Sequence, residues 1–188
     1  MNRSLLCFIF IAVIAVIAVV SGSESGDRVA AGALKQVGVT VTYNPEYVSL
    51  AYPNGDIDPS KGVCADVVIR AMRTIDVDLQ KEIHVDMLAN FKKYPNNWGL
   101  TKPDKNIDHR RVLNLMRFLE RKGKTCAEAT YTPGDIVAWK LNGGLFHIGV
   151  VSASVVPGTG RYAMIHNIGS GAKAEDVLNS YAIIGHYR

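Results

Sequence analysis

This chain of 188 residues contains few cysteines and few aromatic residues, and neither positive nor negative charge is in large excess. Three cysteines are too few for the dense disulfide framework of a small secreted scaffold. A net charge of +4 without a dense cluster of Lys and Arg argues against a dedicated nucleic-acid binder, so we expect no nucleic-acid partner. The hydrophobic content of 48% excludes a disordered chain, and the length suits one globular domain.

Long apolar runs are also missing, with one exception at the N-terminus. Leu5 to Val20 is unbroken and apolar, Arg3 precedes it, and the small residues 21–23 follow it. This order is typical of a signal peptide, and the run is shorter than the ~20 residues of a membrane-spanning helix. We predict a signal peptide over residues 1–22 and a single domain over 23–188 that works in the periplasm or outside the cell. A membrane contact is expected only if the segment is retained as an anchor.

The rest of the chain changes its hydrophobic period from helical to strand-like. Helical spacing covers residues 27–37, 64–75, 79–92 and 109–122, and Asp108 is a plausible N-cap of the last helix. Alternating or β-branched patterns cover residues 39–43, 135–140, 148–152, 162–167 and 182–187. Helices first and strands later predict an α+β domain with an antiparallel sheet.

Cys64 stands at the start of a predicted helix, where backbone amides and the helix dipole favour a thiolate. A thiol nucleophile also needs a histidine within hydrogen-bond reach and a third polar group that orients the ring. His147 and His166 lie on successive predicted strands, which can place the two rings side by side. Asn167 competes with His166 for the orienting role, but successive strand residues face opposite sides, so only one of them can serve. We favour His166.

Four short motifs carry a resemblance to a known family. GVCADVV (62–68), TPGDIV (132–137), HIGVV (147–151) and MIHN (164–167) resemble the NlpC-type cell-wall cysteine peptidases, a branch of the papain-like superfamily. Longer runs such as YPNNWGL and PDKNIDHRR resemble the bacterial family called domain of unknown function 1287 over most of the mature chain. The resemblance implies a papain-like, NlpC-type fold.

The resemblance also implies a mechanism and a substrate class. Cys64 would attack an amide carbonyl and form a thioester, His147 would relay the proton, and His166 would hold the tautomer of His147. The backbone N–H of Cys64 would bind the oxyanion, and Tyr52 occupies the place of a tyrosine that many members carry before the cysteine. The substrate would be a peptide or amide bond in peptidoglycan, and no cofactor is implied.

The chain departs from the family pattern around the nucleophile. Val63 stands where Asp is typical, and Ala65 and Asp66 stand where Ser and Gly are typical. These departures leave the identity of the substrate open, more than the assignment of Cys64 as the nucleophile. Asp66 reads as a partner of the helix dipole, with contact to the substrate as the alternative.

The run Asp108, His109, Arg110 and the following arginine has two interpretations. Arginine can bind a substrate carboxylate through two parallel hydrogen bonds, but such a run is more often a solvated helix face. With His84 and Asp86 the run could suggest a metal site, yet no ligand spacing is strong, so we predict none.

Two other classes of function remain open at this point. The same three residues could carry a different acyl transfer to or from an amide or ester, or the domain could be a non-catalytic module that binds the cell wall. A disulfide between Cys64 and Cys126 is a further possibility in an exported protein, and it would exclude the nucleophile.

Overall fold

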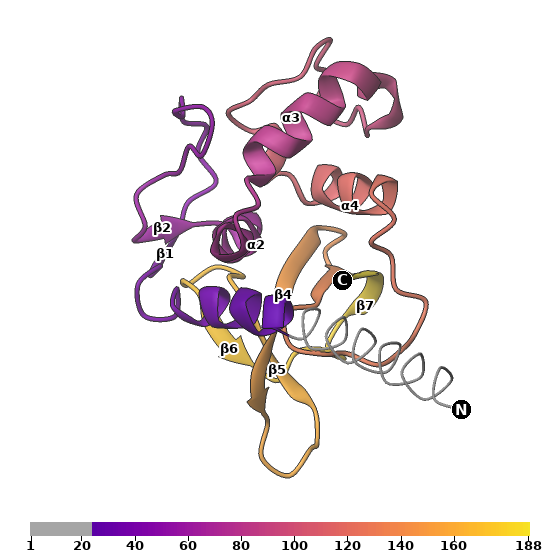
Figure 1. The fold of residues 1–188 in the computed structure, drawn as a ribbon. Helices are drawn as coiled ribbons and strands as arrows, with labels where there is room; N and C mark the ends of the chain where they lie inside the picture. Colours follow the sequence, from indigo (N-terminus) through magenta and orange to yellow (C-terminus); the bar gives the residue numbers. More distant parts are fainter. Residues whose placement is uncertain (1–23) are drawn as a thin grey trace, which may run out of the picture.

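Two layers make up the protein, a set of helices and the β-sheet beneath them (Figure 1). The computed structural model describes residues 24–188, so the predicted signal peptide of residues 1–22 lies outside the described residues. Within residues 24–188, no helix is both long enough and apolar enough to cross a membrane.

The helices lie close to where their spacing predicts them. A first helical segment covers residues 24–34 instead of the predicted 27–37. It is followed by α2 (Cys64–Met72), α3 (Leu79–Asn90) and α4 (Val112–Arg121), with short 3-10 turns η1 (Arg73–Ile75), η2 (Phe91–Lys93) and η3 (Asp108–Arg110). Figure 1 shows α3 and α4 side by side, with α2 seen end-on between them and the sheet. The helix start of α2 therefore lies against the sheet.

The prediction that Asp108 caps the last helix is wrong. Residues 108–110 form the 3-10 turn η3, and α4 begins only at Val112, with Arg111 as its N-cap residue. The carboxylate of Asp108 accepts a hydrogen bond from the backbone of Asp104 and pairs with Arg111 at 3.1 Å. Asp108 therefore stabilises the turn that precedes the helix.

The sheet contains five strands in the order β6-β5-β4-β3-β7, and all neighbouring pairs are antiparallel. Its strands are β3 (Ile136–Lys140), β4 (Phe146–Val155), β5 (Tyr162–His166), β6 (Lys173–Glu175) and β7 (Ala182–Tyr187). The predicted α+β class with an antiparallel sheet is confirmed. Strand β6 was not predicted, because its three residues KAE carry no apolar alternation.

A second, smaller sheet lies directly before the cysteine. Strands β1 (Thr42–Tyr43) and β2 (Lys61–Gly62) pair in parallel, and Tyr43 is opposite Gly62. The predicted strand 39–43 is thus reduced to two residues. Because β2 ends two residues before Cys64, this pairing helps to set where α2 begins.

The five-stranded sheet separates two apolar clusters. The strand residues that face the helices are Ile136, Ala138, Ile148, Val150 and Ile165, and they pack with α2, α3 and α4. The opposite face buries Val137, Trp139, Val151 and Met164 against Leu178. Alternation along each strand produces these two faces.

A buried ion pair ties the start of α2 to the rest of the helical layer. Arg110 donates from Nε to Oδ1 and from Nη2 to Oδ2 of Asp66, both at 2.9 Å. The same guanidinium donates to the backbone carbonyl groups of Asn44 and Glu46 at 3.1 Å each. Both side chains are almost fully buried, so the pair joins α2, η3 and the segment after β1 without contact with solvent.

Replacing Arg110 should therefore destabilise the whole domain. We expect Arg110→Ala to lower the free energy of unfolding by about 3–5 kcal/mol, because Asp66 is left as a buried charge without its partner. Arg117→Ala is the matched control, since Arg117 pairs with Glu120 on the exposed face of α4. That change should cost less than about 0.5 kcal/mol. Urea unfolding at pH 7 measures both, and equal losses would contradict the role given to Arg110.

Candidate functional site

The backbone before Cys64 is held by polar groups from several parts of the chain. Val63 is the N-cap residue of α2 and offers no side-chain acceptor, and its own N–H donates to Asp66 at 2.7 Å. The carbonyl of Gly62 accepts from the backbone of Asn44 and from Nδ2 of Asn167, both at 3.0 Å. Cys64 is therefore presented on a fixed turn between β2 and α2.

The Cys64 thiol is buried, with 5% of the residue exposed. Burial raises the pKa of Cys64 to about 11, although hydrogen bonds from the backbone of Ile148 and Ala65 act to lower it. The negative charge of Asp66 raises the pKa further. The sequence argument that a helix start favours the thiolate is thus outweighed here by desolvation.

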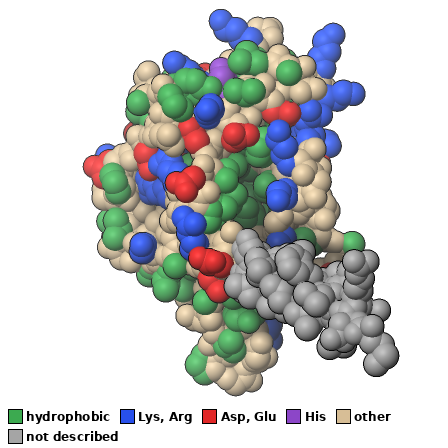
Figure 2. All heavy atoms as spheres, in the orientation of Figure 1, with side chains coloured by type: hydrophobic (Ala, Val, Ile, Leu, Met, Phe, Trp, Pro, Cys, Tyr) green, Lys and Arg blue, Asp and Glu red, His purple; other side chains and the backbone are tan. Residues whose placement is uncertain are grey.

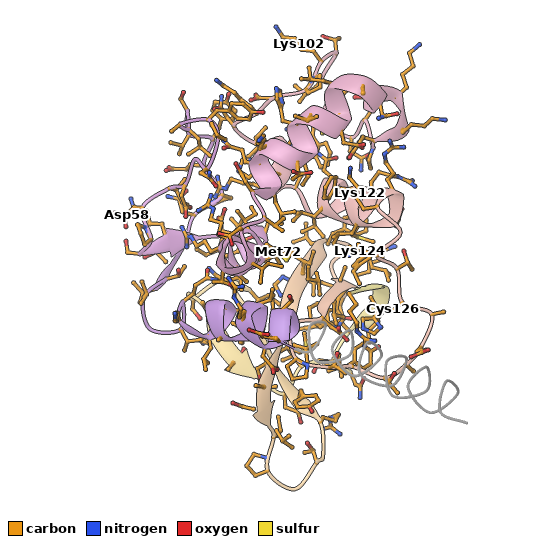
Figure 3. All side chains as sticks on the ribbon, in the orientation of Figure 1. Asp58, Met72, Lys102, Lys122, Lys124 and Cys126 are labelled. Atoms are coloured by element: carbon orange, nitrogen blue, oxygen red, sulfur yellow. The ribbon has the colours of Figure 1, made fainter. Side chains whose placement is uncertain are left out.

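Cys64 and Cys126 are both free thiols. Cys126 lies in the segment between α4 and β3, and its backbone N–H donates to the carbonyl of His186 in β7 at 2.8 Å. Figure 3 places Cys126 on the side of the protein near β7, well away from α2. The disulfide considered from the sequence is absent from the described residues, and Cys64 is left available for chemistry.

His147 and His166 form a buried pair on neighbouring strands. Nε2 of His147 lies 2.9 Å from Nδ1 of His166, and the rings meet edge to face at an angle of 81°. The ring of His147 also stacks on Trp139, its cross-strand partner, at a centroid distance of 5.7 Å. Burial, and secondarily the charge of His166, lower the pKa of His147 to about 3. His147 is therefore neutral at pH 7.

Gly149 makes room for this pair. A Cβ at Gly149 would lie 2.9 Å from the carbonyl oxygen of Ile165 and 3.0 Å from Cβ of His166. It would also approach the ring of Trp139 at 3.3 Å. The glycine in the H-I-G-V-V motif is thus required by the close approach of β5 and Trp139 to β4.

The thiol and the imidazole pair approach the first residues of β4 from its two faces. Ile148, whose backbone acts on the pKa of Cys64, packs in the same cluster as the cysteine on the side of the helices, whereas His147 faces Trp139. Among residues 24–188, no hydrogen bond joins Cys64 to either imidazole. A thiol with a pKa of about 11 and an imidazole with a pKa of about 3 do not exchange a proton at pH 7, so the resting site is neutral.

Asn167 points away from the imidazole pair. Its side chain bonds the carbonyl of Gly62, so the structure uses it to hold the strand that leads to Cys64. His166, one residue earlier, is the neighbour of His147. Successive residues at the end of β5 point to opposite sides, so His166 contacts His147 whereas Asn167 holds the carbonyl of Gly62.

The tyrosine beside the thiol is Tyr43 rather than Tyr52. Burial raises the pKa of Tyr43, and negative charge on the Cys64 sulfur, when it is deprotonated, and on Asp66 raises it further. Tyr52 instead contacts the ring of His84 edge-on at 5.4 Å, and the ammonium group of Lys105 lies over it. The sequence predicted Tyr43 only as the last residue of a strand. The pairing of Tyr43 with Gly62, just before Cys64, is the feature that would have pointed to its place near the thiol.

The remaining sequence candidates lie inside the protein. Asp66 and Arg110 neutralise each other in the buried pair, and Asp108 and His109 are buried within η3. Burial lowers the pKa of His109 to about 4. Asp66 and Arg110 support the backbone around the cysteine, Asp108 holds Asp104 and Arg111, and Nδ1 of His109 is buried without a hydrogen-bond partner in the described part of the chain.

The described part of the chain offers no group of three or more His, Cys, Asp or Glu side chains that could hold a metal ion. His84, which the sequence considered with Asp86, has its Nδ1 buried without a hydrogen-bond partner. Asp86 is engaged by Arg121 at 2.7 Å and by the hydroxyl of Tyr94, also at 2.7 Å. The two residues are thus held by different neighbours.

A cavity of about 620 Å³ lies at the other end of α2. Met72, Ile75, Leu119 and Tyr187 contribute to its mostly apolar wall. Figure 2 shows apolar side chains in a hollow at the centre of this face, bordered by both basic and acidic side chains. Cys64 is the first residue of α2 and Met72 the last, roughly 12 Å apart along the axis, so this cavity is separate from the thiol.

Comparisons with known proteins identify the family. The model of the family described as domain of unknown function (DUF1287) matches residues 30–188, and the chain belongs to this family. The uncharacterized protein YijF of Escherichia coli (strain K12) is 51% identical over 164 residues, which cover 85% of this chain and 80% of that protein.

One solved structure is also similar. NlpC1 from Trichomonas vaginalis aligns with a TM-score of 0.48 and 15% identity, over 87% of this chain and 43% of that chain. The present chain thus spans less than half the length of that protein's chain.

The buried His109 should make the fold sensitive to acid. Its pKa is about 4 in the folded state and ~6.5 in an unfolded chain. The unfolded chain therefore binds the proton first, and the contribution of His109 to stability is complete above pH 6.5 and declines toward pH 4. We expect a loss of about 1.6 kcal/mol between pH 6.5 and 5 from this residue alone.

Urea midpoints of the wild type and of His109→Gln, measured across that pH range, test this expectation. The variant should show a shallower decline with falling pH than the wild type. Parallel declines would show that His109 does not resist protonation in the folded protein.

Proposed function

We propose that this chain is an exported cysteine hydrolase of the papain-like, NlpC-type class, which cleaves an amide or peptide bond through Cys64, His147 and His166. The observation that carries the proposal is the 2.9 Å contact between Nε2 of His147 and Nδ1 of His166. It lies one residue from Ile148, whose backbone is close enough to Cys64 to act on the pKa of the thiol. A nucleophile, a base and a group that orients the base are thereby drawn to the start of β4.

Because both groups are neutral at rest, the thiol proton must leave as the sulfur attacks, and the binding of substrate must bring His147 within reach of the thiol. Nδ1 of His147 then takes the thiol proton while the sulfur attacks the carbonyl carbon, and the backbone N–H of Cys64 stabilises the oxyanion. The C–N bond then breaks as the imidazolium returns its proton to the leaving amine, which leaves a thioester on Cys64. Water attacks the thioester after losing a proton to His147, and the departing sulfur takes that proton back.

Tyr43 is the tyrosine best placed to act on the substrate. Tyr43 is close enough to Cys64 for a charge on the sulfur to raise its pKa, and 37% of the residue is exposed, so it can meet a substrate that approaches the thiol. We assign it the contribution that the family pattern suggested for Tyr52.

The choice of peptidoglycan as substrate rests on the family resemblance together with export. The predicted signal peptide directs the protein to the periplasm or outside the cell, where the peptide cross-links of peptidoglycan are an abundant source of amide bonds. The proposal requires no nucleic acid, metal or cofactor.

A second candidate, a non-catalytic module that binds the cell wall, is favoured by one specific observation. The thiol and the imidazole pair approach β4 from opposite faces without a hydrogen bond between them, and both groups are neutral in the resting protein. A site that only recognises its ligand needs no proton transfer between them.

Digestion of purified sacculi separates the two candidates. The wild type should release soluble fragments, which mass spectrometry would identify, and Cys64→Ala should release none while it still binds sacculi. His147→Ala should be slower by about 10²–10⁴-fold, the usual contribution of a general base. Cys126→Ala is the matched control and should act like the wild type. Binding without release by the wild type would favour the binding module.

Alkylation of the thiol tests the neutral resting state. In the Cys126→Ala background, we expect the rate of reaction of Cys64 with iodoacetamide to keep rising with pH toward the pKa of about 11. A free thiol would instead level off above its ordinary pKa of ~8.5. A plateau near neutral pH would contradict this expectation and would indicate a thiolate–imidazolium pair formed before substrate binds.

A further inference from the structure

A carboxylate that the sequence did not single out lies next to the imidazole pair. Oε2 of Glu175 is 3.2 Å from Nε2 of His166. Glu175 belongs to β6, where it is opposite Met164 of β5, while Lys173 is opposite His166. Residues paired across antiparallel strands point to the same face, so Glu175, Lys173 and His166 share one face of the sheet.

The nitrogen that faces this carboxylate has no other partner. Nε2 of His166 is buried, and the carboxylate of Glu175 at 3.2 Å is the acceptor that lies near it in the described part of the protein, although the contact does not yet form a complete hydrogen bond. The side chain of Glu175 is 41% exposed, so it can turn without disturbing the core. A small rotation would complete a hydrogen bond from Nε2–H to the carboxylate.

Such a bond determines where every proton of the pair resides. A neutral imidazole carries one N–H and one lone pair. If His166 donates from Nε2 to Glu175, its Nδ1 must accept, and His147 must then donate from Nε2. The lone pair of His147 is consequently on Nδ1, the nitrogen that the proposed mechanism uses to take the thiol proton.

The charge of Glu175 acts in the same direction as this hydrogen bond. Burial lowers the pKa of His166, Glu175 raises it again, and Lys173 lowers it. When His147 takes a proton, the positive charge forms beside His166, and His166 faces the carboxylate of Glu175. The carboxylate of Glu175 thus opposes the lowering of the His166 pKa that burial causes.

We propose that Glu175 is a positioning residue that sets the tautomers of His166 and His147 and stabilises the positive charge formed during proton transfer. The catalytic meaning of this inference rests on the proposed hydrolase function, whereas the tautomers can be measured whether or not the protein is a hydrolase. In this role Glu175 accepts a hydrogen bond and no proton passes to it.

Long-range ¹⁵N–¹H NMR of the labelled protein at pH 7.5 reports directly which ring nitrogen of each histidine carries the proton. The wild type should show Nε2–H on both His147 and His166. Glu175→Leu should lose this preference, and a population with the proton on Nδ1 should appear. Glu175→Gln should keep it, because the amide oxygen still accepts from Nε2–H.

Activity on sacculi then separates the charge from the hydrogen bond. Glu175→Gln should release fragments about 10–100-fold more slowly than the wild type, in line with other residues that orient a reacting group from behind it, and Glu175→Leu should lose more. Asp176→Asn is the matched control. It removes the same charge one residue away, where the side chain pairs with Arg161. It should leave both the tautomers and the rate unchanged.

Two results would overturn the inference. One is a wild type in which His166 carries its proton on Nδ1, and the other is a Glu175→Leu variant with unchanged tautomers. If the wild type shows the expected tautomers and Glu175→Leu changes them, but sacculi are not digested, the assignment of Glu175 stands as a positioning role and the hydrolase proposal fails. The two failures are therefore distinguishable.

Discussion

The buried ion pair between Asp66 and Arg110 is the contact on which the arrangement of the candidate site depends. Asp66 lies in the first turn of α2, where it also binds the N–H of Val63, and Arg110 holds the carbonyl groups of the segment after β1. Because a buried charge is costly without its partner, these segments cannot separate independently. The position of Cys64 is fixed by their convergence, although neither charged residue needs to touch a substrate.

The burial that positions the reacting groups also suppresses their charges. The Cys64 thiol is held as a neutral acid and His147 as a neutral base, and both shifts arise mainly from desolvation. Any chemistry at this site must therefore supply charge stabilisation when the proton moves. In the mechanism that we propose, the backbone N–H of Cys64 and the carboxylate of Glu175 supply that stabilisation at the oxyanion and at the imidazole pair.

Local patterns predicted much of this protein. The spacing of apolar residues located α2, α3 and four strands to within a few residues, and the placement of Cys64 at a helix start was correct, because each of these features depends on residues near one another in the chain. Strand β6 was missed because a strand of three residues has no measurable period. Asp108 was misplaced because a 3-10 turn and an N-cap look alike in sequence.

The sequence by itself determined the class of fold, the identity of the helices and main strands, and a cysteine with two histidines as the candidate chemistry. Only the tertiary structure decided the sheet order β6-β5-β4-β3-β7, the pairing of Arg110 with Asp66, and the approach of Glu175 to His166 and of Tyr43 to Cys64. The physical reason is one of range. Side-chain periodicity is read over one or two turns, whereas desolvation and ion pairing depend on neighbours that the folded chain brings together from distant positions.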